Sequence, residues 1–564
     1  MSSLKLFRTT EFALSSFFSP ERERAALHPV WVIVLASVWI ATACNLALWQ
    51  QLARLPGLDN TRGLWFGAGF AVMIAAATSA LLSLLAWRWT LKPAITLFLL
   101  AGAFGAYFML SYGVVIDTTM MINVLQTNPR EVGDLVSWRM LGSVLVLAIL
   151  PAVWLWRKPL RRLTFGRRLL VNTMAFIASC AVLVGVTAIL YKDVSSVMRN
   201  HTQMRYLINP LNSFYALGDI AAKPLERNDS VLLPIGEDAH LGASYATQSK
   251  PPLLLLVLGE TGRAGNFGLN GYARATTPEL AREDVVSLRN AWSCGTSTAS
   301  AVPCMFSPLG RTDFEARKVN YEGLLDVLQR AGLAVLWIDN QAGCKGVCDR
   351  VPHVDTSQLK VPGLCQGGEC FDAIMLDKIN ERIAALPAAA RAKGVVVVMH
   401  QMGSHGPAYY KRSPAAYKKF LPECTSNNLQ DCDREQLVNA YDNTVLYTDH
   451  FLASSIEWLK TQEQQYSPAM IYVADHGESL GENNLYLHGL PYSIAPDVQK
   501  HVPWITWLSP SFQQRDKITT ACLKRQLDAP VSQDNYFHSV LGLLDVQTSV
   551  YQRSMDIYAG CAKP

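Results

Sequence analysis

The chain has 564 residues, of which 50% are hydrophobic and only 17% are charged, and its formal net charge is +5. This length exceeds that of one ordinary domain, and the charged fraction is below the average for soluble proteins. No basic run is interleaved with aromatic residues in the polar half of the chain, so nucleic acid is not expected as a partner.

The N-terminal third of the chain is dominated by apolar stretches, and crossing a bilayer takes about 20 such residues. The fourth stretch is short and contains Pro151, which leaves its limits open. No cleavable signal peptide is expected, because the first stretch lacks a small-residue cleavage site. Five transmembrane helices are predicted: Val30–Trp49, Leu64–Trp87, Ala94–Ile116, Met140–Trp156 and Leu169–Tyr191.

Basic residues predict the orientation of these helices, because cytoplasmic loops are enriched in Lys and Arg. One basic group precedes the first span, and another fills the loop between the fourth and fifth spans. Five spans from a cytoplasmic N-terminus place everything after Tyr191 on the periplasmic side. The basic residues are Lys5, Arg8, Arg22, Arg24, Arg157, Lys158, Arg161, Arg162, Arg167 and Arg168.

Three regions are expected: a transmembrane domain over 1–191, a bridge over 192–250 and a catalytic domain over 251–564. In the bridge, apolar residues such as Met204 mix with Arg199 and Arg205, which suits a helix in the membrane interface or an irregular linker. After Pro251, buried apolar runs alternate with segments of helical periodicity, which predicts an α/β sheet covered by helices on both faces. The expected strands are Leu253–Leu258, Ala334–Ile338, Val395–Met399 and Met470–Ala474, and the expected helices include Tyr321–Arg330 and Asp442–Lys460.

Ten of the twelve cysteines follow residue 290, whereas Cys44 and Cys180 lie inside predicted spans. Sequential pairs of cysteines are typical of disulfides in an oxidising compartment such as the periplasm. The alternative, a zinc–cysteine cluster, is disfavoured because the sequence contains no CxxC pair. Five disulfides are expected: Cys294–Cys304, Cys344–Cys348, Cys365–Cys370, Cys424–Cys432 and Cys522–Cys561.

Each predicted strand ends at a polar group, and the carboxyl ends of the strands are where an open α/β sheet binds its ligand. The groups are Glu260, Asp339, His400 and the Asp475-His476 pair. Glu260, Asp475 and His476 form a plausible zinc site, since zinc accepts oxygen and imidazole ligands. Alternatively, Asp475 caps a helix and His476 is a hydrogen-bonded loop residue. The hydroxyl-rich segment Ser293–Thr298 supplies either a helix N-cap or a nucleophile.

Four motifs carry a resemblance to a known family: Gly259–Ala264, Ser293–Thr298, His400–Pro407 and Asp475–Glu482. Together they resemble the lipid A phosphoethanolamine transferases, which include the mobile colistin-resistance enzymes. The resemblance covers essentially the whole chain. It implies a five-helix transmembrane bundle followed by an α/β/α periplasmic domain of the alkaline phosphatase and sulfatase type.

Carried over by position, the resemblance implies that Thr298 is the nucleophile and becomes a phosphothreonine. It implies a catalytic zinc ion, with a second one in turnover left open, and a ligand set of Glu260, Thr298, Asp475 and His476. Lys345, His405 and His488 match positions that contact the phosphoethanolamine group or a second zinc ion, and His400 fits the same rim. Gln341 stands where relatives carry Asn, which leaves a ligand role for it open.

In the membrane half, Asn123, Thr127 and Glu131 lie four residues apart, a spacing that puts them on one face of a helix. The resemblance implies that this face contacts the head group of the donor lipid. A solvated helix face is the alternative, and Pro129 predicts a short or bent helix.

The function implied is transfer of phosphoethanolamine from phosphatidylethanolamine to a lipid A phosphate by a monomeric inner-membrane enzyme, which confers polymyxin resistance. Alternative acceptors are Kdo, heptose and periplasmic glucans. A lipoteichoic-acid-type glycerol-phosphate synthase shares five spans and a threonine nucleophile, but the ten exported cysteines disfavour it. A catalytically inactive membrane anchor is disfavoured by the complete set of expected ligands.

Overall fold

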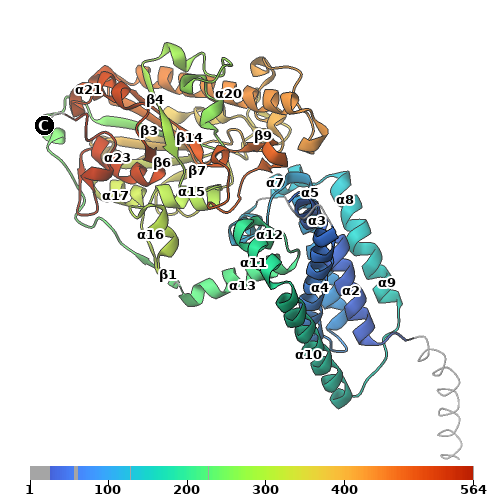
Figure 1. Cartoon of the computed structure of the whole chain (residues 1–564). Coiled ribbons are helices and arrows are strands. Elements are labelled where there is room, and N and C mark those ends of the chain that lie inside the picture. The colour runs from blue at the N-terminus through green and yellow to red at the C-terminus, as the bar shows by residue number, and fades with distance from the viewer. Residues whose placement is uncertain (1–25, 56–60, 128, 227, 563–564) are drawn as a thin grey trace, which may run out of the picture. The chain divides into compact units, whose positions relative to one another are not determined.

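A computed structural model describes residues 26–55, 61–127, 129–226 and 228–562 of the chain (Figure 1). The chain forms two compact units. The first comprises Met1–Thr118 and Val136–Gly218, and the second comprises Thr119–Leu135 and Asp219–Pro564. The residues Lys5, Arg8, Arg22 and Arg24, on which the predicted orientation partly depends, lie outside the described residues.

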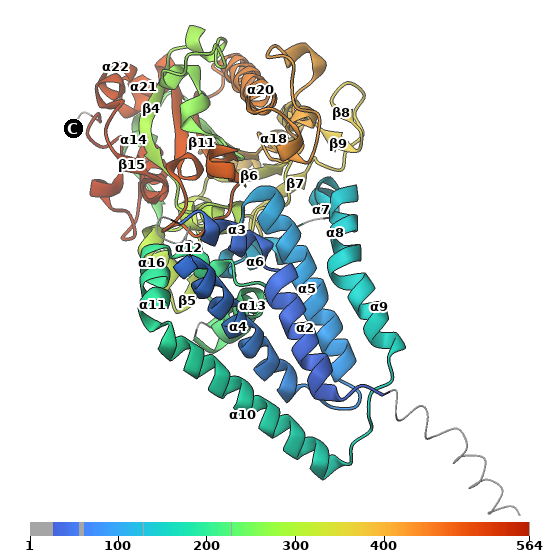
Figure 2. The ribbon, with the colours of Figure 1, turned by 45° about the vertical axis from the view of Figure 1, so that its right-hand side comes forward.

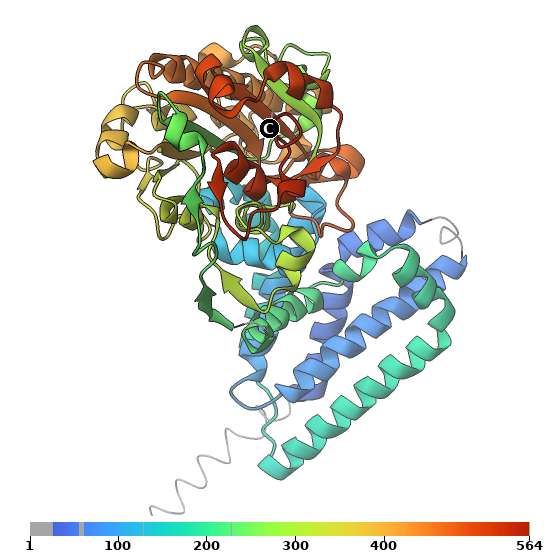
Figure 3. The ribbon, with the colours of Figure 1, turned by 90° about the vertical axis from the view of Figure 1, so that its left-hand side faces the viewer.

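The first unit is a bundle of apolar helices. Within the described residues, four helical segments are long and apolar enough to cross a membrane, and a pair bent by 49° makes a fifth if it counts as one span. In Figure 2, α2 and α5 run side by side, and Figure 3 shows α10 along α4, in agreement with their contacts. The segments are α2 and α3 (Pro29–Ala43 and Leu46–Ala53), α4 (Thr61–Leu84), α5 (Leu91–Tyr112), α8 to α9 (Trp138–Arg157) and α10 (Phe165–Ile189).

The first predicted span is not one continuous helix, because it breaks between α2 and α3. The break leaves backbone carbonyls without helical partners, and two buried asparagines bind them. Asn45 Nδ2 donates to Ile40 O at 2.8 Å, and Asn209 Nδ2 donates to Cys44 O at 2.8 Å. Such satisfaction is obligatory in a membrane, where no water replaces the lost bonds.

The fourth predicted span extends over Trp138–Arg157 and contains a change of helix type. A π-helical turn, Leu145–Ile149, connects α8 (Trp138–Val144) to α9 (Leu150–Arg157). Pro151 lies in the first turn of α9, where its missing N–H costs least. The π turn therefore lets the apolar segment continue past the proline.

The second unit contains an eight-stranded sheet with the order β15-β4-β14-β11-β3-β10-β6-β7. The four predicted strands are present as β11, β3, β10 and β6, and they are adjacent and mutually parallel. Their carboxyl ends therefore meet at one edge. The strands are β3 (Pro252–Gly259), β4 (Val285–Trp292), β6 (Ala334–Asp339), β7 (His353–Asp355), β10 (Val395–His400), β11 (Ser467–Ala474), β14 (His501–Leu508) and β15 (Val531–Ser532).

Helices cover both faces of this sheet. Leu254, Leu256 and Leu258 of β3 belong to one apolar core with α15, α17 and α23, while the alternate residues of β3 face the opposite side. In Figure 1, α20 lies across that opposite side. The predicted three-layer arrangement is confirmed. The helices are α15 (Thr298–Met305), α16 (Gly310–Ala316), α17 (Leu324–Arg330), α20 (Arg434–Thr461) and α23 (Tyr536–Leu543).

Each compact unit is made of two segments of the chain. The bridge begins with three helices, and its last part, after residue 227, is tied to the C-terminal unit because β1 pairs with β5 and β2 pairs with β16. The loop after the third span, 119–135, also belongs to the C-terminal unit. The elements are α11 (Tyr191–Asn200), α12 (Gln203–Tyr206), α13 (Leu211–Glu226), β1 (Asn228–Leu233), β2 (His240–Leu241), β5 (Val319–Tyr321) and β16 (Val546–Gln547).

Candidate active site

The candidate site lies where β3, β10 and β11 end, beside the first residue of α15. Glu260 follows β3, His400 ends β10, and Asp475 and His476 follow β11. All four are at most 1% exposed. Parallel pairing brings these residues together although more than 200 positions separate Glu260 from Asp475.

Thr298 is the residue of the hydroxyl-rich segment that contacts this cluster. Its Oγ1 donates to Glu260 Oε2 at 3.1 Å and lies 3.3 Å from Oε1. Thr298 is the first residue of α15, and the backbone N–H groups of Thr298 and Ala299 precede the first hydrogen bonds of the helix, which Ser300 and Ala301 donate to Ser297 O. The start of this helix therefore favours negative charge next to the Thr298 hydroxyl.

Glu260, Asp475 and His476 have the geometry of a metal site, since one ligand atom from each lies within 4.8 Å of the others. His476 Nδ1 donates to Gly477 O at 2.9 Å, which leaves Nε2 with a lone pair. Asp475 Oδ2 and His476 Nε2 are buried and lie 3.3 Å apart, and neither makes a hydrogen bond of good geometry within the described part of the chain. Burial and the nearby negative charge of Asp475 raise the pKa of Glu260. A cation fits this donor set, because it satisfies both orphaned atoms and neutralises the carboxylates.

His400 adjoins the same cluster. Its Nδ1 lies 3.1 Å from Asp339 Oδ2, and its Nε2 lies 3.9 Å from Glu260 Oε2. Burial lowers the pKa of His400, but the Asp339 carboxylate raises it and the net direction is upward. Trp337 Nε1 also donates to Asp339 Oδ2, at 2.8 Å, so the carboxylate that orients His400 is itself fixed.

Two further histidines lie close to His476. The ring centroid of His488 is 4.3 Å from that of His476 and 5.6 Å from that of His405. Burial, and then the charge of a neighbouring histidine, keep the pKa of both His405 and His488 well below the ordinary value. Both rings are therefore neutral at pH 7 in the absence of ligand, and each offers a nitrogen lone pair.

Lys345 and Gln341 lie in the loop after β6. Lys345 has a positive φ of 52°, and its Nζ donates to Ala342 O at 3.1 Å. Gln341 is buried, and its Oε1 accepts the N–H of Ala342. The amide oxygen of Gln341 is thus used within its own loop.

The segment with Asn123, Thr127 and Glu131 does not form one continuous helix, which agrees with the short or bent helix that Pro129 predicts. The helix α6 (Thr118–Gln126) ends before Thr127, and α7 (Pro129–Leu135) begins at the proline, which cannot continue the preceding helix. Burial and the negative charge of Glu260 raise the pKa of Glu131 to about 7, so Glu131 still lies near the site. The segment is held by Asp134, which Arg412 contacts at 3.0 Å.

A cavity of about 1090 Å³ adjoins the start of α15. It is lined by Asn123 of α6, by Ala299 and Ser300 of α15 and by Lys345. Ala299 follows Thr298 directly in the chain, so the cavity adjoins the helix that begins with the candidate nucleophile.

Comparisons with known proteins agree with this geometry. Residues 252–546 match the Sulfatase family, and residues 74–225 match the family described as phosphoethanolamine transferase EptA/EptB. The chain is 40% identical to phosphoethanolamine transferase EptA of Salmonella typhimurium over 96% of this chain and 98% of that protein. The chain belongs to the EptA family of phosphoethanolamine transferases.

Other members of the EptA family extend the likeness. Phosphatidylethanolamine transferase Mcr-1 of Escherichia coli is 36% identical over 86% of this chain and 90% of its own length. The integral membrane lipooligosaccharide phosphoethanolamine transferase A of Neisseria meningitidis is 35% identical, with a TM-score of 0.90 over 96% of this chain and 100% of that structure. The chain is therefore an integral membrane protein, and its predicted fold class is confirmed.

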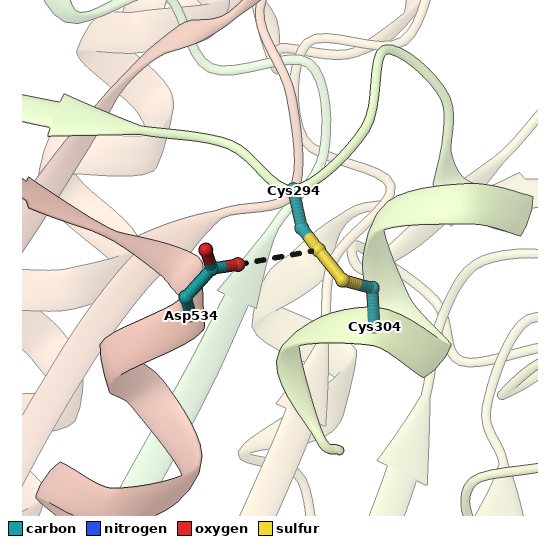
Figure 4. A group of neighbouring side chains, drawn as sticks. All are labelled: Cys294, Cys304 and Asp534. Carbon is teal, nitrogen blue, oxygen red and sulfur yellow. Dashed lines mark hydrogen bonds between the residues drawn. A yellow bond between two sulfur atoms is a disulfide. The ribbon is translucent and has the colours of Figure 1, made fainter. Parts of the chain in front are cut away.

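The second unit contains five disulfides, and they join the same pairs that the sequence analysis names. Cys304 lies in α15, and Cys294 lies in the loop before it, so their bond closes a loop that contains Thr298 (Figure 4). Asp534 Oδ1 is 3.7 Å from Cys294 Sγ. This bonded pair offers no thiolate to a metal.

Sequence reasoning missed the groups that position the histidines. Glu478 is fully buried, accepts the Tyr409 hydroxyl at 2.9 Å and lies 2.9 Å from His488 Nδ1. Burial raises the pKa of Glu478 to about 8, although the charge of His476 lowers it. Glu478 lies inside the motif Asp475–Glu482, but its partners lie in other segments, so the motif alone assigns it no role.

Proposed function

We propose that the chain transfers phosphoethanolamine from phosphatidylethanolamine to a phosphate of lipid A, with Thr298 as the covalent carrier. The observation that carries this proposal is the Thr298 hydroxyl, 3.1 Å from Glu260 and beside the orphaned ligand atoms of Asp475 and His476. The printed names of Mcr-1 and of the Neisseria meningitidis enzyme support the donor and the acceptor class, respectively.

The proposed metal is zinc, held by Glu260, Thr298, Asp475 and His476. Two carboxylates, an imidazole and a hydroxyl form a ligand set of the type and number that zinc prefers. When bound there, zinc supplies Lewis acidity that lowers the pKa of the Thr298 hydroxyl and offsets negative charge on the phosphoryl group.

In the first proposed step, Thr298 Oγ1 attacks the phosphorus of phosphatidylethanolamine. The bond from phosphorus to the diacylglycerol oxygen breaks, and this oxygen receives the proton that Thr298 loses. The product is a phosphodiester between Thr298 and ethanolamine. The backbone N–H groups at the start of α15 are placed to stabilise negative phosphoryl oxygens during this step.

We assign the surrounding residues to substrate contacts. Lys345 supplies a positive charge, and His400, His405 and His488 supply imidazole nitrogens around the phosphoryl group or a second metal ion. Asn123, Thr127 and Glu131 contact the donor head group, for which the carboxylate of Glu131 suits the ammonium end. The cavity lining by Asn123 and Lys345 supports this assignment.

The location proposed for the C-terminal unit is the periplasm, with a cytoplasmic N-terminus. Five disulfides support an oxidising compartment. A modified lipid A phosphate loses negative charge, and weaker attraction of cationic peptides such as polymyxin follows. We propose a monomer as the working form.

Two measurements test the proposal. Purified full-length protein mixed with phosphatidylethanolamine vesicles is expected to carry phosphoethanolamine on Thr298, as peptide mass spectrometry can detect. Lipid A from expressing cells is expected to carry phosphoethanolamine on a phosphate group. Modification of Kdo instead would keep the chemistry and overturn the acceptor. A relative 26% identical to this chain is named Kdo(2)-lipid A phosphoethanolamine 7''-transferase.

Removing the Cys294–Cys304 disulfide is expected to lower turnover more than thermal stability. A misplacement of about 1 Å at the nucleophile costs on the order of a hundredfold in rate. Cys522 and Cys561 are 39 residues apart, against 10 for Cys294 and Cys304, so chain entropy predicts about 4 kcal/mol of stabilisation against about 3. Double-serine variants of each pair are assayed for transfer and for melting temperature. The variant without Cys294–Cys304 should lose more turnover, and the variant without Cys522–Cys561 should lose more thermal stability. Equal behaviour of the two pairs would contradict the positioning role.

A further inference from the structure

The cavity beside α15 is larger than a donor head group requires. Sites for drug-sized ligands measure about 300–1,000 Å³, whereas this cavity encloses about 1090 Å³. Asn123 and Lys345 line one part of it, and Arg311 and Arg317, on α16 and just after it, line another. The donor step as proposed uses no residue of the cavity near α16.

Arg311 is held by residues that also contact the segment before Thr298. Its backbone N–H donates to Asp534 Oδ1 at 2.9 Å, the carboxylate that also contacts Cys294. Its guanidinium lies 4.2 Å from the ring centre of Tyr492, whose hydroxyl donates to Ser293 O at 3.0 Å. Arg311 is thus positioned by the segment that begins the loop of Thr298.

The charge of Arg311 is available to a ligand. Its ion pair with Glu315 is 3.4 Å long, and the Glu315 side chain is 61% exposed, so solvent screens the pair. Arg350, which also lines the cavity, differs because Asp326 binds it with two hydrogen bonds of 2.6 and 2.7 Å.

The acidic groups around the cavity do not cancel this charge. Glu322 is paired with Arg330 at 2.7 Å, and Asp349 is exposed to solvent. A guanidinium stacked on an aromatic ring keeps its outer N–H groups in a fork that matches a phosphate.

We propose that the Arg311 side of this cavity binds the phosphate of the acceptor glycolipid for the second step. The inference rests on the proposed two-step function and deepens it by locating the acceptor. In-line attack places the attacking acceptor oxygen opposite Thr298 Oγ1, where the diacylglycerol oxygen left, and the rest of the acceptor phosphate then needs a subsite beside that position. A negatively charged nucleophile approaching a phosphodiester anion needs a cation at that subsite.

In this second step, an oxygen of the acceptor phosphate attacks the phosphorus carried by Thr298. The bond between that phosphorus and Thr298 Oγ1 breaks, and a diphosphate linkage forms. Thr298 regains the proton that the acceptor phosphate loses. Arg311 holds the non-attacking oxygens of the acceptor and takes no part in the first step.

Arg311→Ala tests the proposal by separating the two steps. The full-length variant is charged with phosphatidylethanolamine vesicles and then mixed with lipid A in detergent, and the phosphothreonine is followed by intact-protein mass spectrometry. Formation is expected to stay within about twofold of the wild type. Decay at a fixed lipid A concentration is expected to slow about 10- to 100-fold, the size of a lost charge-assisted hydrogen-bond pair.

Two comparison variants sharpen the test. Arg311→Lys keeps the charge but loses the fork, so its decay rate is expected between those of Arg311→Ala and the wild type. Arg289→Ala removes an arginine of β4 whose partner, Asp528, has a 77% exposed side chain, and it is expected to behave as the wild type. If Arg311→Ala lowers the melting temperature, Arg311→Gln keeps the aliphatic part of the side chain, removes the charge and gives the same readout.

Either of two results would overturn the assignment. Slow formation of the adduct in Arg311→Ala would move Arg311 to the donor site, and unchanged decay would remove it from acceptor binding. Absence of the adduct in the wild type is a different result, because it would refute Thr298 as the carrier.

Discussion

Thr298→Ala is expected to abolish transfer, with a loss of roughly a thousandfold or more, while the fold remains intact. Thr298 Oγ1 is the hydroxyl that donates to Glu260, and no other hydroxyl of the segment Ser293–Thr298 has a described hydrogen bond to that carboxylate. Without this oxygen the phosphoryl group has no carrier. Lipid A mass spectrometry and intact-protein mass spectrometry provide the two readouts.

Thr296→Ala is the matched control for this substitution. Thr296 lies two residues earlier and is also buried, but its Oγ1 donates to Leu490 O at 2.6 Å. This variant is expected to form the adduct on Thr298, with a modest loss of stability from the broken hydrogen bond. If Thr298→Ala retained full activity and Thr296→Ala lost it, the nucleophile would be Thr296.

The sheet around the site could be predicted from sequence because its central strands are buried on both faces. β10, for example, begins with four consecutive valines, and its neighbours are equally apolar. β14 and β4 were not predicted, because residues that are unusual in a buried strand interrupt each of them. Pro503 interrupts β14 at an irregularity in its pairing with β4, between Val502 and Trp504, where a proline is tolerated. Arg289 and Asn290 interrupt the apolar run of β4.

The position of the segment 119–135 could not be predicted from local pattern. Its sequence reads as a loop between membrane helices, yet it belongs to the unit that contains the candidate site. Asp134 holds it through Arg412 and Lys411, which lie more than 270 positions later in the chain. The local sequence pattern of the segment cannot predict ion pairs with such distant residues. The contacts of Glu478 could not be predicted for the same reason.

Glu260, Asp475 and His476 could be proposed from sequence, because each follows a predicted strand. The atoms with which they would bind a metal could not be predicted, since this depends on which side-chain atoms make no hydrogen bond. Asp475 Oδ1 accepts the N–H groups of Thr261 and His476, and this leaves Oδ2 alone to face the cluster. That division of one carboxylate between backbone and cluster is visible only in three dimensions.

Removing one ligand is expected to lower zinc affinity by at least about a hundredfold, because an ion that prefers four ligands then has three. Asp475→Asn is the sharpest variant. Its amide oxygen can still accept the two backbone N–H groups, so the local fold persists, but its NH₂ replaces the orphaned oxygen and cannot bind a cation. Glu260→Ala and His476→Ala should lose metal as well. Elemental analysis of the purified proteins measures the zinc content.

Chelation should reveal the same site through stability. Bound metal stabilises the folded state in proportion to the logarithm of its concentration over Kd. Its removal also leaves the buried carboxylates of Glu260 and Asp475 facing each other, and their repulsion is already expressed in the raised pKa of Glu260. Chelator should therefore lower the melting temperature of the wild type and of Asp497→Asn, a surface control whose side chain is 76% exposed. Asp475→Asn should show little response. A full zinc complement in Asp475→Asn, or an equal chelator response in all three proteins, would refute this ligand set.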